Sequence, residues 1–172
     1  LQLTPGERIQ AFIPLKEEDF VEDRYLFMAT RNGLVKKTPL SDFKNIRKGG
    51  IIAISLREGD ELIRTLLTDG NQEIIMASHE GFSVRYSEQD VRSMGRSAMG
   101  VKGMELSDGD YVIDTERIRE DADVLTISEN GFGKRTPAEE YRIQTRGGKG
   151  ILTMHITEKT GKLAAMKVVS GE

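Results

Sequence analysis

The feature that most constrains this chain is an internal repeat with a period of roughly 50 residues. Three segments align without gaps on the glycines Gly33, Gly81 and Gly131. A second and a third glycine follow in each repeat, at Gly50 and Gly59, at Gly100 and Gly109, and at Gly150 and Gly161, and the third occurs once more as Gly6. A period of this length is typical of stacked or radial arrays, so we expect repeated units that share a core.

Each repeat has the local signals of β-strands joined by tight turns. Asn32-Gly33 and Asn130-Gly131 predict hairpins, because both turn residues tolerate the positive φ that a two-residue turn needs. A capping residue followed by proline, as at Thr38-Pro39 and Thr136-Pro137, predicts one short helical turn after the second strand of the hairpin, and Ser87 has the same role in the middle repeat.

A further strand is expected after the second glycine of each repeat. Met104 and Leu106 alternate with Glu105, and the same alternation occurs around residues 54 and 154. A period of two with one apolar side indicates half-buried strands. No segment has a long helical stripe, which makes a parallel α/β fold a poor hypothesis. The predicted fold class is all-β, with four-stranded units arranged as in a propeller.

The repeat also predicts the domain organisation. The chain is expected to be one partial array of about three and a half units, too few to close a circle. Residues 1–24 would be the tail of a preceding unit and a linker, and the units themselves would span residues 25–72, 73–122 and 123–172.

Composition excludes several classes of protein. The sequence has no cysteine, which removes disulfides, thiolate zinc sites and cysteine nucleophiles. No apolar run approaches the roughly 20 residues of a membrane helix, and the first residues do not resemble a signal peptide. We therefore expect no membrane partner and a cytoplasmic location. The acid clusters around Glu18 and Asp121 lack the glycine-framed spacing of a metal loop, so no metal site is predicted.

Basic residues recur with the repeat, although the chain as a whole has a formal charge of −3. One aligned position is filled by Lys37, Arg85 and Arg135, and another by Lys44, Arg92 and Arg142. Residues 31–50, 82–103 and 132–151 carry net charges of +5, +2 and +3, whereas the remainder carries −13. The sequence therefore predicts one basic edge on each unit.

Two interpretations of this basic edge remain open. Lysine and arginine commonly protect strand edges and keep a protein soluble. Equivalent cations on stacked units would instead form a curved track, which suits bent double-stranded DNA held through its phosphates. An acidic remainder would limit non-specific binding elsewhere on the surface.

The third repeat contains a glycine-rich loop, Gln144-Thr145-Arg146-Gly147-Gly148-Lys149-Gly150. Successive glycines let backbone N–H groups approach a phosphate, and Arg146 and Lys149 add charge. The loop is not a P-loop, because the residue after Lys149 is neither serine nor threonine, so no ATP site is predicted. A tight turn between strands is the alternative interpretation.

This loop resembles the QRRGGKG box of the DNA gyrase A C-terminal domain, with Thr145 in place of an arginine. The wider pattern, including NGLVKKTPLSDF and NGFGKRTPAEEYRIQTRGGKGI, is similar to successive blades of that family over nearly the whole chain. The resemblance implies a β-pinwheel, a six-bladed ring with DNA on its basic outer edge, of which this chain would form roughly half. In the family the box lies in the first blade, so the loop of the third repeat here could be a degenerate copy.

The resemblance also implies partners and a function. The parent protein would be an ATP-dependent type II topoisomerase that introduces negative supercoils, assembled from two A and two B subunits, in which this module bends double-stranded DNA. ATP and magnesium would bind other parts of that enzyme, and no cofactor is expected in this chain. The active-site tyrosine lies outside this chain, so none of its tyrosines, Tyr25, Tyr86, Tyr111 and Tyr141, is assigned a catalytic role.

The candidate DNA-binding residues are the basic side chains of the three windows. They are Lys36, Lys37, Lys44, Arg47, Lys48, Arg85, Arg92, Arg96, Lys102, Lys134, Arg135, Arg142, Arg146 and Lys149. The corresponding domain of topoisomerase IV is one alternative, and a propeller-like protein-interaction module is another.

Overall fold

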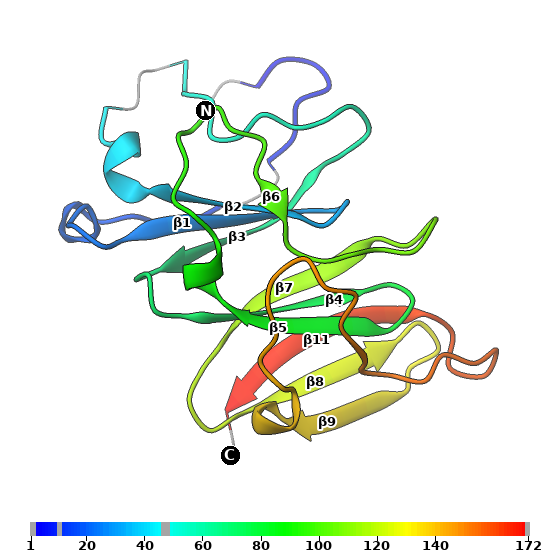
Figure 1. Ribbon diagram of the computed structural model, residues 1–172. Coiled ribbons are helices and arrows are strands. Elements are labelled where there is room, and N and C mark those ends of the chain that lie inside the picture. Colours follow the sequence, from blue (N-terminus) through cyan, green and yellow to red (C-terminus); the bar gives the residue numbers. More distant parts are fainter. Residues whose placement is uncertain (1–2, 10–11, 46–48, 171–172) are drawn as a thin grey trace.

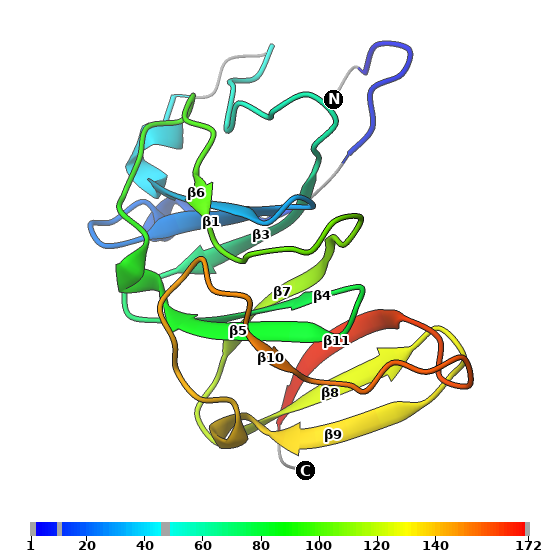
Figure 2. The ribbon, with the colours of Figure 1, turned by 45° about the vertical axis from the view of Figure 1, so that its right-hand side comes forward.

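The computed structural model describes residues 3–9, 12–45 and 49–170, and within them it contains only strands and short 3-10 turns. The prediction of an all-β fold is confirmed. The strands form three sheets that stack face to face in chain order, from the N-terminal sheet at the top of Figure 1 to the C-terminal sheet at the bottom. The loops that follow the 3-10 turns run along one side of this stack (Figure 2).

The first two sheets have four strands and the third has three. In spatial order, the first sheet contains β3 (Leu62–Thr68), β1 (Tyr25–Thr30), β2 (Leu34–Pro39) and β6 (Val101–Lys102). The second contains β7 (Val112–Ile118), β4 (Glu73–Ser78), β5 (Phe82–Ser87) and β10 (Ile151–Leu152). The third contains β11 (Leu163–Ser170), β8 (Ala122–Ser128) and β9 (Gly133–Pro137). We refer to these sheets as blades one, two and three.

The predicted hairpins and short turns are present, but the turns differ from the expected two-residue type, because only the glycine of each Asn-Gly pair has positive φ. The pairs β1–β2, β4–β5 and β8–β9 are antiparallel hairpins. Their turn glycines Gly33, Gly81 and Gly131 have φ of 89°, 92° and 85°, a region that other residues rarely adopt. Three 3-10 turns follow the hairpins, η2 (Leu40–Phe43), η3 (Glu88–Asp90) and η4 (Ala138–Glu140), and a fourth, η1 (Glu17–Asp19), precedes β1.

The strands expected after the second glycine differ from the prediction in length and in partner. They are only two residues long in β6 and β10, and residues 51–56 form no strand. Each pairs with the blade before its own repeat, β6 with β2 and β10 with β5. Met104 and Met154 are nevertheless buried and Glu105 is exposed, as the alternation indicates. Each complete blade therefore closes with a strand from the following repeat.

The core lies between the blades. Phe27 and Ala29 of β1 pack against Met76 and Val84 of blade two, whereas Ile75 and Ala77 point the other way and pack against blade three. The central strands β1 and β4 are thus covered on both faces, and five of the six residues in each are buried. This stacking holds the loop at the end of each hairpin in an equivalent place on successive blades.

Candidate nucleic-acid interface

The first aligned set of cations, Lys37, Arg85 and Arg135, lies at the end of each hairpin that carries the 3-10 turn. Lys37 is 6% exposed, and its ammonium group donates to the Glu88 carbonyl oxygen at 3.2 Å and lies 3.7 Å from the Glu88 carboxylate. The same ammonium group lies 4.9 Å from the centre of the Tyr25 ring. Lys37 therefore connects blade one to turn η3 of blade two.

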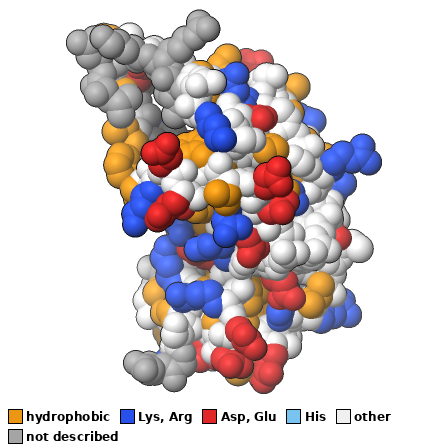
Figure 3. Space-filling model, turned by 90° about the vertical axis from the view of Figure 1, so that its left-hand side faces the viewer, with side chains coloured by type: hydrophobic (Ala, Val, Ile, Leu, Met, Phe, Trp, Pro, Cys, Tyr) orange, Lys and Arg blue, Asp and Glu red, His pale blue; other side chains and the backbone are white. Residues whose placement is uncertain are grey.

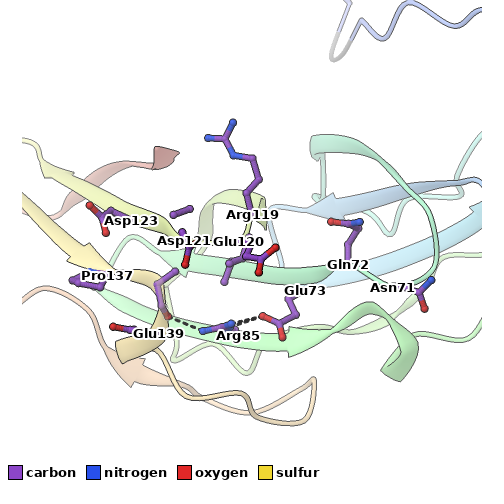
Figure 4. Close-up of a pocket in the computed structure, with 13 residues that line it drawn as sticks. Asn71, Gln72, Glu73, Arg85, Arg119, Glu120, Asp121, Asp123, Pro137 and Glu139 are labelled. Atoms are coloured by element: carbon purple, nitrogen blue, oxygen red, sulfur yellow. Dashed lines mark hydrogen bonds and ion pairs between the residues drawn. The ribbon is translucent and has the colours of Figure 1, made fainter. Parts of the chain in front are cut away.

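Arg85 forms the equivalent connection between blades two and three. Its Nη1 donates to the carbonyl oxygens of Ala138 at 2.7 Å and Tyr141 at 2.9 Å, on either side of turn η4. Its Nε donates to the Glu73 carboxylate at 2.8 Å (Figure 4), and only 14% of the side chain is exposed. All of these contacts are internal to the protein.

Lys36, also expected on the basic edge, is fully buried. Its ammonium group donates to three backbone carbonyl oxygens, those of Ala53 at 2.6 Å, Ala98 at 3.1 Å and Arg96. Burial, with a smaller contribution from the charge of Arg96, lowers the pKa of Lys36 to about 8.

The expectation that the basic side chains of each repeat form an exposed edge therefore does not hold for Lys36 and Lys37, which are buried, and Arg85 is mostly covered. The next repeat supplies covering atoms in each case, from Arg96 and Ala98, from Glu88, and from Ala138 and Tyr141, while Ala53 and Glu73 of the same repeat also contact Lys36 and Arg85. Lys134 and Arg135, at the corresponding positions of blade three, are exposed, and Arg135 contacts Asp123 and the Ser170 carbonyl oxygen of its own blade.

The second aligned set is exposed, as a basic outer edge requires. Lys44, Arg92 and Arg142 are exposed and follow turns η2, η3 and η4 at equivalent places. Within the described residues, no hydrogen bond or ion pair is found for their charged groups. Ser93 and Ile143, the next residues after Arg92 and Arg142, form bridges to Lys37 and Arg85 of the preceding blade. Arg92 and Arg142 therefore lie where two blades meet, and Lys44 follows turn η2 at the equivalent position of the first repeat.

The glycine-rich loop of the third repeat forms backbone hydrogen bonds with the second repeat. The Gln144 N–H donates to the Arg85 carbonyl oxygen at 2.7 Å, and the Gly147 N–H donates to the Gly103 carbonyl oxygen at 2.7 Å. At Gly150, which has φ of 82°, a Cβ atom would lie 1.9 Å from the Ser83 carbonyl oxygen, so only glycine fits. These contacts favour the interpretation of the loop as a turn that joins blades.

The cations of this loop have different roles. The Arg146 guanidinium donates to the carbonyl oxygens of Asp90 and Lys102, both at 2.9 Å. Arg96, its equivalent in the second repeat, donates to the Ile52 carbonyl oxygen at 3.2 Å. Both arginines are partly exposed, so they combine a structural contact with a charge near the surface.

Lys149 and Lys102 are more accessible than these arginines. Both are exposed; Lys149 lies over the Phe82 ring at 5.4 Å, and Lys102 contacts Glu105 at 2.5 Å. Two further candidates, Arg47 and Lys48, lie outside the described residues.

A cleft between blades two and three lies at the same end of the hairpins, and it is predominantly acidic. Glu73, Glu120, Asp121, Asp123 and Glu139 line it together with Arg85 and Arg119 (Figure 4). Among the residues with described positions, no group of three or more side chains could hold a metal ion. The carboxylates oppose a phosphate here, so the cleft is not part of the candidate interface.

Basic side chains are spread over all the blades on the face shown in Figure 3. Lysine and arginine lie at several heights along the stack, with acidic side chains between them (Figure 3). The candidate interface is the set of accessible cations on the loops and strands at the outer edge of the blades. They are Lys44, Arg92, Arg96, Lys102, Lys134, Arg135, Arg142, Arg146 and Lys149.

One cluster that the sequence did not predict joins the opposite ends of the hairpins. Arg31 lies 3.8 Å from the centre of the Tyr111 ring, and His79 stacks on the other side with 4.5 Å between ring centres. Glu129 lies 3.7 Å from His79. Arg31, His79 and Glu129 occupy the same position in successive repeats, and this alignment is the sequence feature that could have predicted their contact. The contact was missed because the three side chains are of different chemical types.

In the part of the chain with described positions, no helix is long and apolar enough to cross a membrane. The family model described as "DNA gyrase C-terminal domain, beta-propeller" matches residues 24–69, 72–119 and 122–170. Its three matches correspond to the three repeats.

Individual proteins that are similar in sequence or in structure are DNA gyrase A and DNA topoisomerase IV proteins. A DNA gyrase A protein from Halalkalibacterium halodurans is 65% identical over 99% of this chain, which spans 20% of that protein. The solved C-terminal domain of DNA topoisomerase IV has a TM-score of 0.88 at 29% identity and covers 98% of this chain, which accounts for 52% of the solved chain. A solved DNA gyrase A C-terminal domain has a TM-score of 0.77 at 26% identity, with 97% of this chain and 59% of that chain covered.

The fold class and the three repeats thus agree with the family that the sequence resembles. The chain belongs to the DNA gyrase C-terminal domain family, and its sequence corresponds to a fragment of gyrase A.

Proposed function

We propose that this chain binds the phosphate backbone of double-stranded DNA and helps to bend it, as part of the C-terminal domain of gyrase A. The observation that carries the proposal is the recurrence of Lys44, Arg92 and Arg142 at equivalent positions after turns η2, η3 and η4, exposed and without an ion-pair partner in the described structure. A cation that contacts no carboxylate of its own protein is available to a phosphate, and its binding releases counterions from the DNA.

The role of the chain would be mechanical rather than catalytic. Bending a short duplex by 40–90° costs on the order of 1–6 kcal/mol, which several phosphate contacts on each blade would offset. The parent enzyme would use the bent segment for strand passage that introduces negative supercoils. We infer that the cleavage and ATP-binding sites belong to the remainder of gyrase A and to gyrase B, in an assembly of two A and two B subunits on the bacterial chromosome.

The corresponding domain of topoisomerase IV is the second candidate, because the fold is very similar to the solved domain of that enzyme, with a TM-score of 0.88. The 65% identity to a gyrase A protein over 99% of this chain favours gyrase. Both candidates require the same phosphate contacts.

The test is the salt dependence of DNA affinity in the chain and in two charge-matched variants. We expect the slope of log K against log salt to fall by about 1 for each phosphate contact that is removed, and affinity to fall about tenfold or more, when Lys44, Arg92 and Arg142 are all changed to alanine. The control variant changes Lys16, Lys159 and Lys167, three exposed lysines outside these loops, to alanine. Fluorescence anisotropy with a labelled duplex measures both quantities, and equal losses in the two variants would contradict the proposal.

A further inference from the structure

Arg146, one of the candidate DNA-binding cations, contacts the neighbouring repeat through its guanidinium group. Its Nε donates to the Asp90 carbonyl oxygen and its Nη1 to the Lys102 carbonyl oxygen, both at 2.9 Å. Both acceptors belong to the second repeat, whereas Arg146 lies in the glycine-rich loop of the third. The arginine therefore joins the outer loops of two successive repeats, which run along the same side of the stack (Figure 2).

The two acceptors lie at the ends of one outer loop, residues 90–102 of the second repeat. Asp90 is the last residue of turn η3, and Lys102 is the last residue of β6. Arg92, two residues after Asp90, and Lys102 itself are exposed cations of the candidate interface, although the third repeat packs beside them. One guanidinium group thus holds both ends of the loop that carries these two cations.

Arg146 is itself held in place by the backbone that follows it. The Gly147 N–H donates to the Gly103 carbonyl oxygen at 2.7 Å, and the Gly148 carbonyl oxygen accepts from the Glu105 N–H at 2.9 Å. A guanidinium group on such a fixed backbone reaches two carbonyl oxygens at once, because its donors have a rigid planar arrangement. The flexible ammonium group of lysine lacks this arrangement.

The same contact occurs once more between the first and second repeats. Arg96, which aligns with Arg146, donates through its Nη1 to the carbonyl oxygen of Ile52 at 3.2 Å, and Ile52 aligns with Lys102. Both arginines therefore bond to the equivalent carbonyl oxygen of the preceding repeat. Arg146 makes the more extensive contact, because it adds a second bond, to Asp90, and both of its bonds are shorter.

We propose that Arg146 is a positioning residue for DNA binding, which fixes the outer loop of the second repeat against that of the third. Arg92 and Lys102 are then presented at a set distance from the cations of the third repeat, as contact with successive phosphates of one duplex requires. The inference rests on the proposed function, and it assigns to Arg146 a role through other residues rather than a phosphate of its own. Two of its donors are already occupied by carbonyl oxygens.

The test compares Arg146→Ala with Arg146→Lys in the 172-residue chain, by fluorescence anisotropy with a labelled duplex over a range of salt concentrations. Lysine can replace a cation that contacts a phosphate directly, but it cannot replace a guanidinium group that bonds two carbonyl oxygens. We therefore expect both variants to weaken DNA binding by roughly fivefold or more. The slope of log K against log salt should also fall in both, although Arg146→Lys keeps the charge.

A measurement without DNA checks the positioning itself. The amide protons of Gly147 and Glu105 form the hydrogen bonds between repeats that lie beside Arg146. In both variants we expect these two amide protons to exchange with solvent roughly threefold faster or more, because loss of the guanidinium contacts lets the two loops separate.

Arg117→Lys is the matched control. Arg117 of β7 is also exposed and also donates to the preceding repeat, to the Leu67 carbonyl oxygen at 2.8 Å, but β7 lies at the edge of blade two opposite β10. This variant should bind DNA like the unchanged chain. Arg96→Lys, which removes a single longer bond between outer loops, is a milder variant and should weaken DNA binding by roughly twofold.

The possible outcomes separate this inference from the proposed function. If Arg146→Lys bound DNA as tightly as the unchanged chain, or if amide exchange at Gly147 and Glu105 stayed unchanged in both variants, the positioning role would be overturned while DNA binding stood. An equal loss of affinity in Arg117→Lys would also overturn it, because any broken bond between repeats would then have the same effect. If the unchanged chain did not bind the duplex, the proposed function would fall, and this role with it.

Discussion

At the scale of single residues, the same position in the repeat has three different environments. Lys36 is enclosed by three carbonyl oxygens, Val84 replaces it in blade two, and Lys134 is exposed in blade three. A buried ammonium group is tolerated only when its donors are satisfied, which the carbonyl oxygens of Ala53, Arg96 and Ala98 achieve. The environment of the lysine therefore decides its role.

The first prediction concerns Lys36. Lys36→Met removes the donor to the carbonyl oxygens of Ala53 and Arg96 and one of the two donors to that of Ala98, which also accepts from the Ser55 N–H. This substitution should lower the free energy of unfolding by about 1–3 kcal/mol at pH 7. Lys134→Met is the matched control and should change it by less than about 0.5 kcal/mol. Urea unfolding followed by circular dichroism measures both.

The pH dependence of this difference has a definite sign. Burial lowers the pKa of Lys36 from 10.5 to about 8, so the unfolded chain binds more protons at this group than the folded chain between those values. The free energy of unfolding of the unchanged protein should therefore rise with pH above about 8, relative to Lys36→Met, by at most about 1.4 kcal/mol per unit. Parallel pH profiles for the two proteins would contradict this assignment.

At the scale of elements, the 3-10 turns connect neighbouring blades. Turn η3 supplies the Glu88 carbonyl oxygen to Lys37, and the ends of η4 supply those of Ala138 and Tyr141 to Arg85. The carboxylate of Glu88 is fully buried and accepts from the Thr68 hydroxyl and the Gln72 N–H, both at 2.8 Å. Each of these short turns thus supplies carbonyl oxygens that accept hydrogen bonds from a cation of the preceding blade.

The second prediction separates the two aligned sets of cations. Arg85→Ala removes the donors to the Glu73 carboxylate and the Tyr141 carbonyl oxygen, and one of the two donors to the Ala138 carbonyl oxygen. It should lower the free energy of unfolding by about 2–4 kcal/mol. Arg142→Ala, one residue beyond Tyr141 and exposed, should change it by less than about 0.5 kcal/mol and should weaken DNA binding instead. Thermal unfolding and anisotropy on the same samples test the pair, and a stable Arg85→Ala protein would refute the structural role.

At the scale of the whole molecule, the stability of each blade depends on its neighbour, because β6 and β10 pair with the blade that precedes their own repeat. Residues of the second repeat complete blade one, and residues of the third complete blade two. The two clusters at the blade interfaces share β4 and β7, which contribute Met76 and Val112 to one, and Ile75 and Ile118 to the other. Loss of one interface therefore weakens the other.

The third prediction is a single cooperative unfolding transition. We expect hydrogen exchange in urea to report the same free energy of opening for β1 and β4, because neither blade is complete alone. Gly150→Ala, which introduces a Cβ atom 1.9 Å from the Ser83 carbonyl oxygen, should lower the midpoint for both strands. Gly148→Ala, with its nearest neighbour at 3.7 Å, is the control, and destabilisation confined to β4 and β5 would show that the blades unfold independently.

The whole-molecule charge also has a structural explanation. The chain has a net charge of −3, yet Lys44, Arg92 and Arg142 are exposed after the 3-10 turns while carboxylates line the cleft beside Arg85. Net charge alone argues against DNA, whereas the positions of individual charges support the proposed interface.

The sequence by itself determined the features that depend on neighbouring residues. Gly33 specifies the hairpin turn through its positive φ, which Asn32 does not share, and Thr136-Pro137 precedes a 3-10 turn, because these conformations are set within a few residues. The repeat, the all-β class and the exposed set containing Arg92 and Arg142 follow from the same local signals.

Only the tertiary structure decided which blade each short strand completes and which cations are buried. Lys37 and Lys44 are indistinguishable as lysines at aligned positions, but Lys37 is covered by Glu88, which is 51 residues away in the sequence. Burial of a charge depends on whether distant carbonyl and carboxylate oxygens come to lie against it. Those contacts arise because the blades stack and because β6 and β10 each pair with the preceding blade. No local sequence pattern specifies either arrangement.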